Sequence, residues 1–290
     1  MTIKHLVLSG GAYRGFHIFG AFKYLIDKEF IFQKNLKTIH CVSVGSLFGS
    51  LLCMGLNLDS LQEYIVNKPW EKIFHLTPEY LFKLNKNFGI YDIDVFVDIF
   101  TTLLKSKGKN KNITLKELYE YSNIELYIYS TKLSDWKKIE FSYKTHPDLK
   151  VIDAVYMSST LPCVFKPLFY HDSFYLDGGL TNSYPLNECL DCSFNRNEIL
   201  SIVVKNDEPQ KILSNETNMM SYMWCILNNI IVNSQENYYK NGTIKNELII
   251  PVKNLNLKEA TEVVKNIQSR KNLIEDGEKF AKLFVNYTTV

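Results

Sequence analysis

The chain has 290 residues, of which 46% are hydrophobic and 13% aromatic, so it can bury a large core without disulfides and is not expected to be disordered. Its 33 basic and 31 acidic residues leave a formal net charge of +2. This near balance excludes a nucleic-acid-binding protein that relies on bulk positive charge, and we expect no nucleic-acid partner.

The first half of the chain alternates short apolar runs with segments of helical spacing. Each apolar run is rich in β-forming residues, and small and apolar residues recur on one face of the helical segments. The predicted elements are a strand over residues 4–8, a glycine turn, a helix over 16–28, a strand over 38–42, helices over 44–54, 58–66 and 92–104, and a polar loop over 105–112.

The second half continues the pattern. It predicts strands over residues 124–131 and 136–143, a helix over 149–158, a hairpin with strands over 168–170 and 174–176, a strand over 198–204, a helix over 217–235, a strand over 247–252 and one long helix over 258–284. Strands interleaved with helices indicate an α/β protein whose mainly parallel sheet is covered on both faces. We see no break in composition and predict a single domain over residues 1–290.

Targeting and redox signals favour the cytoplasm. The N-terminal apolar run is too short for a signal peptide, and no stretch is apolar over the ~18 residues that a transmembrane helix needs. The six cysteines are therefore interpreted as reduced thiols. Cys189 and Cys192 have a zinc-like spacing, but no second ligand pair follows them, so a plain loop is the better interpretation.

Ser43 lies where a predicted buried strand turns sharply into a helix. A nucleophile elbow needs small residues two positions before and two after its serine, because strand and helix crowd together there. Gly45 meets this requirement, whereas Cys41 stands where glycine is usual. The pattern occurs in many chains, and the alternative is a serine that caps the helix N-terminus.

Residues 9–15, Ser-Gly-Gly-Ala-Tyr-Arg-Gly, form the turn between the first strand and the first helix. Glycines there allow successive backbone N–H groups to point into one cavity and bind an anion. One interpretation is a nucleotide phosphate site, although Ala12 stands where the dinucleotide fingerprint has glycine. The other is an oxyanion hole for acyl transfer, and a plain tight turn is the third.

Asp177, Gly178 and Gly179 follow the second strand of the predicted hairpin. Asp-Gly-Gly is usually a turn. After an apolar strand, however, it presents a carboxylate at the edge of the sheet, with room beside it. A carboxylate that acts as a base must be partly desolvated, so that its pKa rises toward the working pH.

Together, the glycine turn, the serine elbow and the Asp-Gly-Gly segment resemble the patatin-like phospholipase family. Further matches are Gly89-Ile90-Tyr91-Asp92, which is similar to the family's Gly-Leu-Tyr-Asp, the stretch from Met157 to Pro167, and Asn182 with Pro185. The resemblance covers roughly residues 4–190. It implies a three-layer αβα fold with a mainly parallel sheet, and hydrolysis of lipid or phospholipid acyl esters by a serine–aspartate dyad without calcium.

The resemblance also implies residue roles. Ser43 is the nucleophile and Asp177 the base, while backbone N–H groups hold the oxyanion. The expected N–H donors are Gly10, Gly11, Ala12 and Val44, and the supporting motif residues are Arg14, Gly15, Gly45, Gly178 and Gly179.

Two departures from the family pattern bear on activity. Ala12 replaces a glycine of the turn but keeps its N–H, and Cys41 brings a Cβ into the elbow. A slow or inactive protein that binds lipid on the same fold is therefore the alternative function. No histidine follows Asp177, where a Ser-Asp-His triad would place it, so His17 and His40 are interpreted as structural. We expect neither a metal nor a cofactor.

Aromatic residues alternate with lysines over residues 68–88. Trp70, Phe74 and Phe82, with Lys68, Lys72, Lys83 and Lys86, form a pattern that suits peripheral contact with a membrane surface. The alternative is an ordinary cap over the core. The apolar stripe over residues 219–231 is interpreted as core.

Overall fold

The computed structural model describes residues 2–288, except 76–83, 85, 106, 109, 193, 208–218 and 236–240. Its main sheet has the order β10 (Asn246–Val252), β9 (Ile199–Asn206), β1 (His5–Leu8), β2 (Thr38–Val42), β4 (Glu125–Lys132), β8 (Ser173–Asp177) and β7 (Leu168–Tyr170), with β5 (Lys137–Phe141) also paired to β4. The strands from β10 to β4 are parallel, whereas β5, β7 and β8 pair in antiparallel fashion.

Side-chain alternation along the central strands supplies a core on each face of the sheet. Leu6 and Leu8 of β1 belong to the larger hydrophobic cluster, whereas Val7 between them belongs to a second cluster with Leu186 and Cys189. All four residues of β1 and all five of β2 are buried, as expected for parallel strands covered on both sides.

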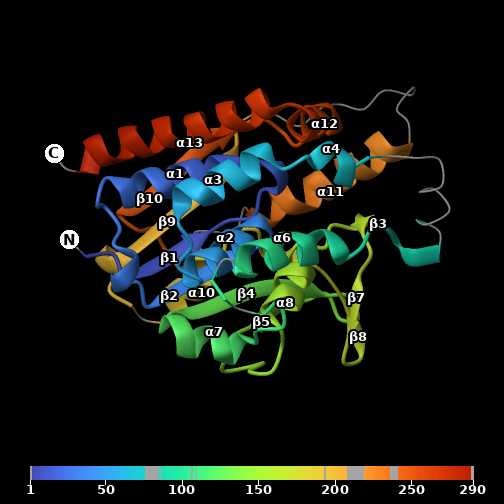
Figure 1. The fold of residues 1–290 in the computed structure, drawn as a ribbon, viewed down its shortest axis with the longest axis horizontal. Coiled ribbons are helices and arrows are strands. Elements are labelled where there is room, and N and C mark those ends of the chain that lie inside the picture. The colour runs from blue at the N-terminus through green and yellow to red at the C-terminus, as the bar shows by residue number, and fades with distance from the viewer. Residues whose placement is uncertain are drawn as a thin grey trace.

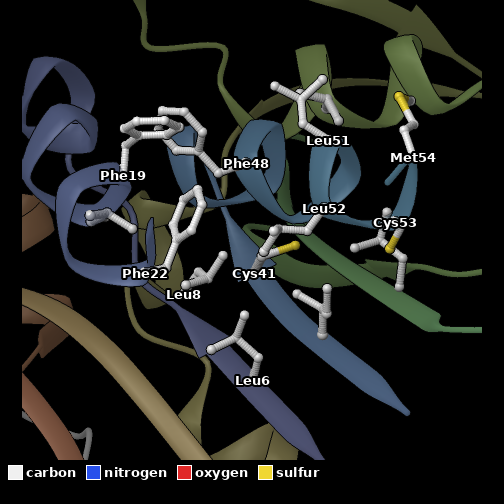
Figure 2. Packing of buried hydrophobic residues seen from close by; sticks show 14 of the residues in the cluster. Leu6, Leu8, Phe19, Phe22, Cys41, Phe48, Leu51, Leu52, Cys53 and Met54 are labelled. Atoms are coloured by element: carbon white, nitrogen blue, oxygen red, sulfur yellow. The ribbon is translucent and has the colours of Figure 1, made fainter. Parts of the chain in front are cut away.

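One face carries most of the helices. These are α1 (Gly15–Asp27), α2 (Val44–Cys53), α8 (Val151–Ser158) and α13 (Ile267–Thr288), with α3 (Leu58–Asn67), α6 (Asp94–Lys105) and α7 (Leu115–Ser122) beside them. Figure 1 shows α13, α1 and α3 running side by side along one flank. In Figure 2, the rings of Phe19, Phe22 and Phe48 meet Leu8 between α1, α2 and the sheet.

The other face is covered by α9 (Gly179–Asn182) and α10 (Leu186–Asp191), and α11 (Met219–Gln235) packs on α9. Smaller elements complete the described chain: α4 (Trp70–Ile73), α12 (Leu257–Lys265) and the two-stranded sheet of β3 (Gly89–Tyr91) and β6 (Cys163–Phe165). The predicted α/β class and the three-layer αβα arrangement with a mainly parallel sheet are confirmed. No helix in the described part of the chain has the length and apolar character to span a bilayer.

Several elements differ from the sequence predictions, since α4, α9, α10, β3 and β6 were not predicted. Helix α7 was not expected; Thr114 begins it with a capping box that includes Glu117. The single helix predicted over residues 258–284 is wrong, because the backbone is extended at Asn266 and separates α12 from α13. The Asn266 side chain accepts a hydrogen bond from the N–H of Gln268, so it caps the second helix instead of continuing the first.

Arg270 satisfies the backbone carbonyls that helix ends leave without partners. Its side chain is 1% exposed, and it donates to Val66 at the end of α3 and to Val263 and Val264 at the end of α12. Terminal carbonyls have no intrahelical donor, and burial makes an unpaired carbonyl costly. One side chain therefore ties the C-terminal helices to α3.

We predict that Arg270→Met lowers the free energy of unfolding by about 2–4 kcal/mol, because it keeps the apolar stem but leaves three carbonyls without their donor. Chemical denaturation measures the change. Lys271→Met, at the exposed neighbouring position, is the matched control and should change stability by less than about 0.5 kcal/mol. Equal effects of the two substitutions would contradict this role.

Candidate active site

Ser43 and Asp177 come from two strands that end against adjacent residues of β4. Strand β2 runs parallel to β4 and pairs Val42 with Tyr129, whereas β8 runs antiparallel to β4 and pairs Asp177 with Ser130. Because β5 occupies the opposite side of β4, β2 and β8 approach each other end to end along one side. This register brings together two residues that are 134 positions apart in the sequence.

Ser43 Oγ donates a hydrogen bond to Asp177 Oδ2 at 2.6 Å, and both residues are buried. The serine backbone has φ 53° and ψ −129°, a conformation that side-chain-bearing residues rarely adopt and that is typical of a strained elbow. Ser43 precedes the first residue of α2, but its side chain makes no capping hydrogen bond. The alternative of a helix-capping serine is therefore wrong for the side chain.

Asp177 is fully enclosed beside the serine. Its Oδ1 accepts a hydrogen bond from the N–H of Gly179 at 2.7 Å, while Oδ2 accepts from Ser43. Burial raises the pKa of this carboxyl from its ordinary 3.8 to about 6, and the two hydrogen bonds oppose that rise. The carboxylate thus has the environment of a general base that works near neutral pH.

Two glycines make the close approach of these strands sterically allowed. A Cβ on Gly45 would lie 2.5 Å from the carbonyl oxygen of Ser9, where α2 crosses the end of β1. A Cβ on Gly178 would lie 2.2 Å from the carbonyl oxygen of Tyr129 on β4. Both distances are shorter than van der Waals contact, so larger residues would push the serine and the aspartate apart.

The end of α8 holds both partners, and the sequence analysis assigned it no role. Ser158 Oγ accepts the backbone N–H of Ser43 at 2.8 Å and donates to the carbonyl of Tyr129 at 2.6 Å. The carbonyls of Ser158 and Thr160 accept the N–H groups of Gly178 and Asp177. In the sequence, the stretch from Met157 to Pro167 was noted only because it is similar to a family pattern, and that similarity did not indicate these hydrogen bonds.

The glycine turn lies against the same pocket, but only some of its N–H groups are free of a hydrogen-bond partner within the described structure. The N–H of Gly10 donates to the carbonyl of Ser183 at 2.9 Å, which occupies one of the expected oxyanion donors. The N–H groups of Gly11, Ala12 and Val44 have no partner among the described residues. Of the four N–H groups expected to bind an oxyanion, these three therefore remain available. Ala12 has φ 50°, a backbone conformation that favours glycine, so its side chain is held there at some cost in stability.

The pocket in front of the dyad is narrow. Gly10, Gly11, Ala12 and Arg14 of the turn line it, together with Leu161, Ser183, Val204, Leu255 and the α11 residues Asn228 and Ile231. The space open to the centre of a water molecule is about 20 Å³, which is room for one or two waters. The Oδ1 atoms of Asn206 and Asn228 on this pocket have no hydrogen-bond partner in the described structure.

Residues 13 and 14 anchor the turn to the C-terminal part of the chain. The Arg14 side chain is 5% exposed and donates to the carbonyl of Lys253, and Tyr13 donates to Glu259 at 2.7 Å. Gly15 begins α1 directly behind the turn. These contacts fix the turn that faces Ser43.

The described histidines lie outside the serine–aspartate pair. His40 is buried against Tyr129, and burial lowers its pKa to about 3. Burial also lowers the pKa of His17 to about 4, so both imidazoles are neutral near pH 7. Among the described residues, no three His, Cys, Asp or Glu side chains are grouped to hold a metal ion.

Cys41 is fully buried, and its side chain points into the core between β2 and α2 (Figure 2). Its thiol reaches the carbonyl of Tyr127 at 3.4 Å. Glycine at position 49 of α2 leaves space for the sulfur, since a Cβ there would lie 3.1 Å from it. The extra side chain at the elbow is therefore accommodated on the core side of the strand.

The aromatic residues expected at a membrane are only partly described. Trp70 and Phe74 are half-buried and stack on each other, and Phe74 also contacts the rings of Tyr91 and Phe165. Lys68 is paired with Asp98 at 2.5 Å. Phe82 and Lys83 lie outside the described residues. The packing of Trp70 and Phe74 favours the alternative of a cap over the core.

Comparison with known proteins places residues 6–190, more than half of the chain, in a family described as Patatin-like phospholipase. "Uncharacterized protein R571" of Acanthamoeba polyphaga mimivirus is 30% identical over 63% of this chain and 60% of that protein. "Probable lipid hydrolase 463L" of Invertebrate iridescent virus 6 is 27% identical over 63% of this chain and 62% of that protein. The similarity therefore spans less than two thirds of either relative.

Among solved structures, VipD from Legionella pneumophila matches 99% of this chain and 67% of its own chain, with a TM-score of 0.58 and 15% sequence identity. At this identity the likeness shows the fold alone. It includes the C-terminal helices that lie beyond residue 190.

We predict that Asp177→Asn changes the free energy of unfolding, relative to the native protein, in a more favourable direction at pH 8 than at pH 4.5. The folded-state pKa of about 6 exceeds the ordinary 3.8, so the folded protein holds more protons between these values, and its stability falls as pH rises through them. Asparagine removes this cost. The stability of the variant relative to the native protein should rise by about 1–3 kcal/mol between the two pH values.

Urea denaturation at both pH values measures this change. Asp172→Asn, at an exposed turn, is the matched control and should show no such dependence. A stability difference for Asp177→Asn that is the same at both pH values would contradict a costly buried carboxylate.

Proposed function

Since this chain belongs to the patatin-like phospholipase family, we propose that it is a serine acyl hydrolase that cleaves ester bonds in lipids. The observation that carries the proposal is the direct hydrogen bond from Ser43 Oγ to a buried Asp177 oxygen at 2.6 Å. The relative of Invertebrate iridescent virus 6 that is named as a probable lipid hydrolase supports the substrate class.

In the proposed reaction, Asp177 accepts the proton of Ser43 as Oγ attacks the ester carbonyl. The carbonyl oxygen then becomes negative and accepts hydrogen bonds from the N–H groups of Gly11, Ala12 and Val44. Val44 is the first residue of α2, whose N-terminal partial charge favours the same anion. As the intermediate collapses, Asp177 gives its proton to the leaving alcohol oxygen and the C–O bond breaks, which leaves an acyl-enzyme. Asp177, again unprotonated, then accepts a proton from the water that hydrolyses the acyl-enzyme and returns that proton to Ser43. No step requires calcium.

The raised pKa of Asp177 supports its role as the base. A carboxylate with a pKa near its ordinary value would hold a serine proton poorly at neutral pH, whereas desolvation makes this oxygen more basic. Gly179 and Ser43 occupy its two oxygens with donors, so the carboxylate is held in place without an imidazole. Ser158 Oγ accepts a hydrogen bond from the backbone N–H of Ser43 and so holds the nucleophile in position.

We predict that Ser43→Ala and Asp177→Asn each lower turnover of a soluble short-chain ester by at least about 10³-fold, because each removes one half of a single unit. The double variant should be no slower than the single variants. His40→Gln should keep most activity, and EDTA should leave turnover unchanged.

A fluorophosphonate probe provides an independent readout, since it reacts with activated serines. It should label the native protein at Ser43 and fail to label Ser43→Ala. Absence of labelling in a folded native protein would favour the alternative of a lipid-binding protein without activity. A calcium requirement would contradict the mechanism.

We also predict a single ionisation in the acid limb of kcat/KM. Asp177 must be unprotonated to accept the proton, so the rate constant should rise about tenfold per pH unit below a pKa of about 6 and level off above it. Initial rates of soluble ester hydrolysis between pH 4.5 and 8 measure this profile. A profile that is flat across this range would exclude Asp177 as the titrating base.

A further inference from the structure

Exposed apolar side chains, most of them aromatic, lie at one end of the sheet on three segments that are distant in sequence. Together with the half-buried Phe174, we call them the edge patch: Phe88, Leu133, Trp136, Phe169 and Phe174. Phe88 and Phe169 are each 61% exposed, Trp136 is 48% exposed and Leu133 is 43% exposed. The ring of Phe174 joins the segments, with centroids 6.1 Å from Phe88 and 5.1 Å from Phe169. The N–H of Leu133 donates to the carbonyl of Phe174 at 2.9 Å.

Two members of the edge patch are held in strained backbone positions. Phe88 has φ 60° and Trp136 has φ 53°, in the left-handed region that favours glycine, asparagine and aspartate. A bulky residue there costs stability, and normally burial of the ring would offset that cost. Here both rings remain largely in solvent. Strain without compensating burial points to a role outside the fold itself.

The edge patch lies on the same edge of the sheet as the dyad. Asp177 ends β8, and Phe174 lies three residues earlier on the same strand, about 10 Å farther out along the direction in which β4 ends. Figure 1 shows β3, β7 and β8 together at the end of the molecule opposite both chain termini. A flat surface that met this end would therefore lie close to the entrance of the catalytic pocket.

The charges on the three segments favour an anionic surface. Across residues 86–91, 133–138 and 166–174, the exposed basic side chains are Lys86, Lys137, Lys138 and Lys166, and the exposed acidic ones are Asp135 and Asp172. Lys137 is paired with Asp135 at 3.3 Å and Lys138 with Glu188, so among the described residues Lys86 and Lys166 are the basic side chains of these segments that have no ion pair. Aromatic rings with flanking lysines suit the boundary between lipid head groups and acyl chains. Basic residues near that boundary add attraction to anionic lipids.

We propose that the edge patch docks on the surface of a lipid bilayer that contains anionic lipids, and so delivers the dyad to its substrate. This proposal rests on the function proposed above, because it assumes that the substrate is presented at a lipid surface. It assigns the membrane contact to Phe88, Trp136 and Phe169, in place of the half-buried Trp70 and Phe74.

The test compares a double variant, Phe88→Asn with Phe169→Ser, with the native protein. Binding is measured by co-sedimentation with phosphatidylcholine vesicles, with and without phosphatidylserine. The native protein should bind best with phosphatidylserine, and the double variant should bind at least about tenfold more weakly. Hydrolysis of a soluble short-chain ester should be unchanged, because neither residue lines the catalytic pocket. Phe32→Ser, an exposed phenylalanine between α1 and β2 at the opposite edge, should bind like the native protein.

Phe88→Asn alone separates docking from folding. Asparagine tolerates the left-handed backbone, so this variant should have an unchanged or higher melting temperature while its vesicle binding falls. A loss of stability together with a loss of both vesicle binding and soluble ester hydrolysis would show that Phe88 serves the fold, and would overturn the proposal.

Three other results separate the possible explanations. Unchanged vesicle binding by the double variant would overturn the proposal. If the native protein self-associates, the double variant is monomeric and vesicle binding is unaffected, then the edge patch is a contact between copies of this chain. Patch-dependent vesicle binding without hydrolysis of any ester would instead sustain the docking surface and reject the proposed enzymatic function.

Discussion

The site depends on one buried hydrogen bond, from the hydroxyl of Ser43 to the carboxylate of Asp177. A carboxylate this deeply buried is costly, and the N–H of Gly179 and the hydroxyl of Ser43 offset part of that cost by donating to its two oxygens. The end-to-end approach of β2 and β8 along β4 sets the separation of the two residues. The serine at the end of α8, Ser158, then fixes the backbone on the serine side.

Sequence reasoning could predict the parts of this arrangement that depend on local pattern. Apolar runs and glycine turns located the strands of the main sheet and the helices α1 and α2, because burial on both sides of a parallel sheet leaves a clear signal. They did not locate β3 and β6. Ser43, Asp177 and the glycine turn were also recognisable, since each lies at a strand end followed by small residues. The resemblance to a family joined them, although local pattern alone left a helix-capping serine and a phosphate site open.

What could not be predicted depends on register and on backbone hydrogen bonds. Nothing in the local sequence shows that Asp177 pairs with Ser130, or that Ser183 accepts the N–H of Gly10. The break at Asn266 was missed for a related reason: the apolar spacing continues through it, while the asparagine side chain and Arg270 satisfy the helix ends. Such features arise from contacts between distant segments, which periodicity does not record.

Several residues with positive φ lie near the proposed chemistry. Ala12 and Ser43, both in left-handed conformations, flank the pocket, and Phe88 and Trp136 hold exposed rings at the same edge of the sheet. By contrast, Asn123 adopts this conformation at the end of α7, where it is an ordinary helix terminus. Glu29 and His171 also have positive φ, in turns that follow α1 and β7. At Ala12 and Ser43, in contrast, the departure from local preference occurs where the backbone faces the pocket. The same edge of the sheet therefore holds both strained backbone positions and the exposed rings that would contact a lipid first.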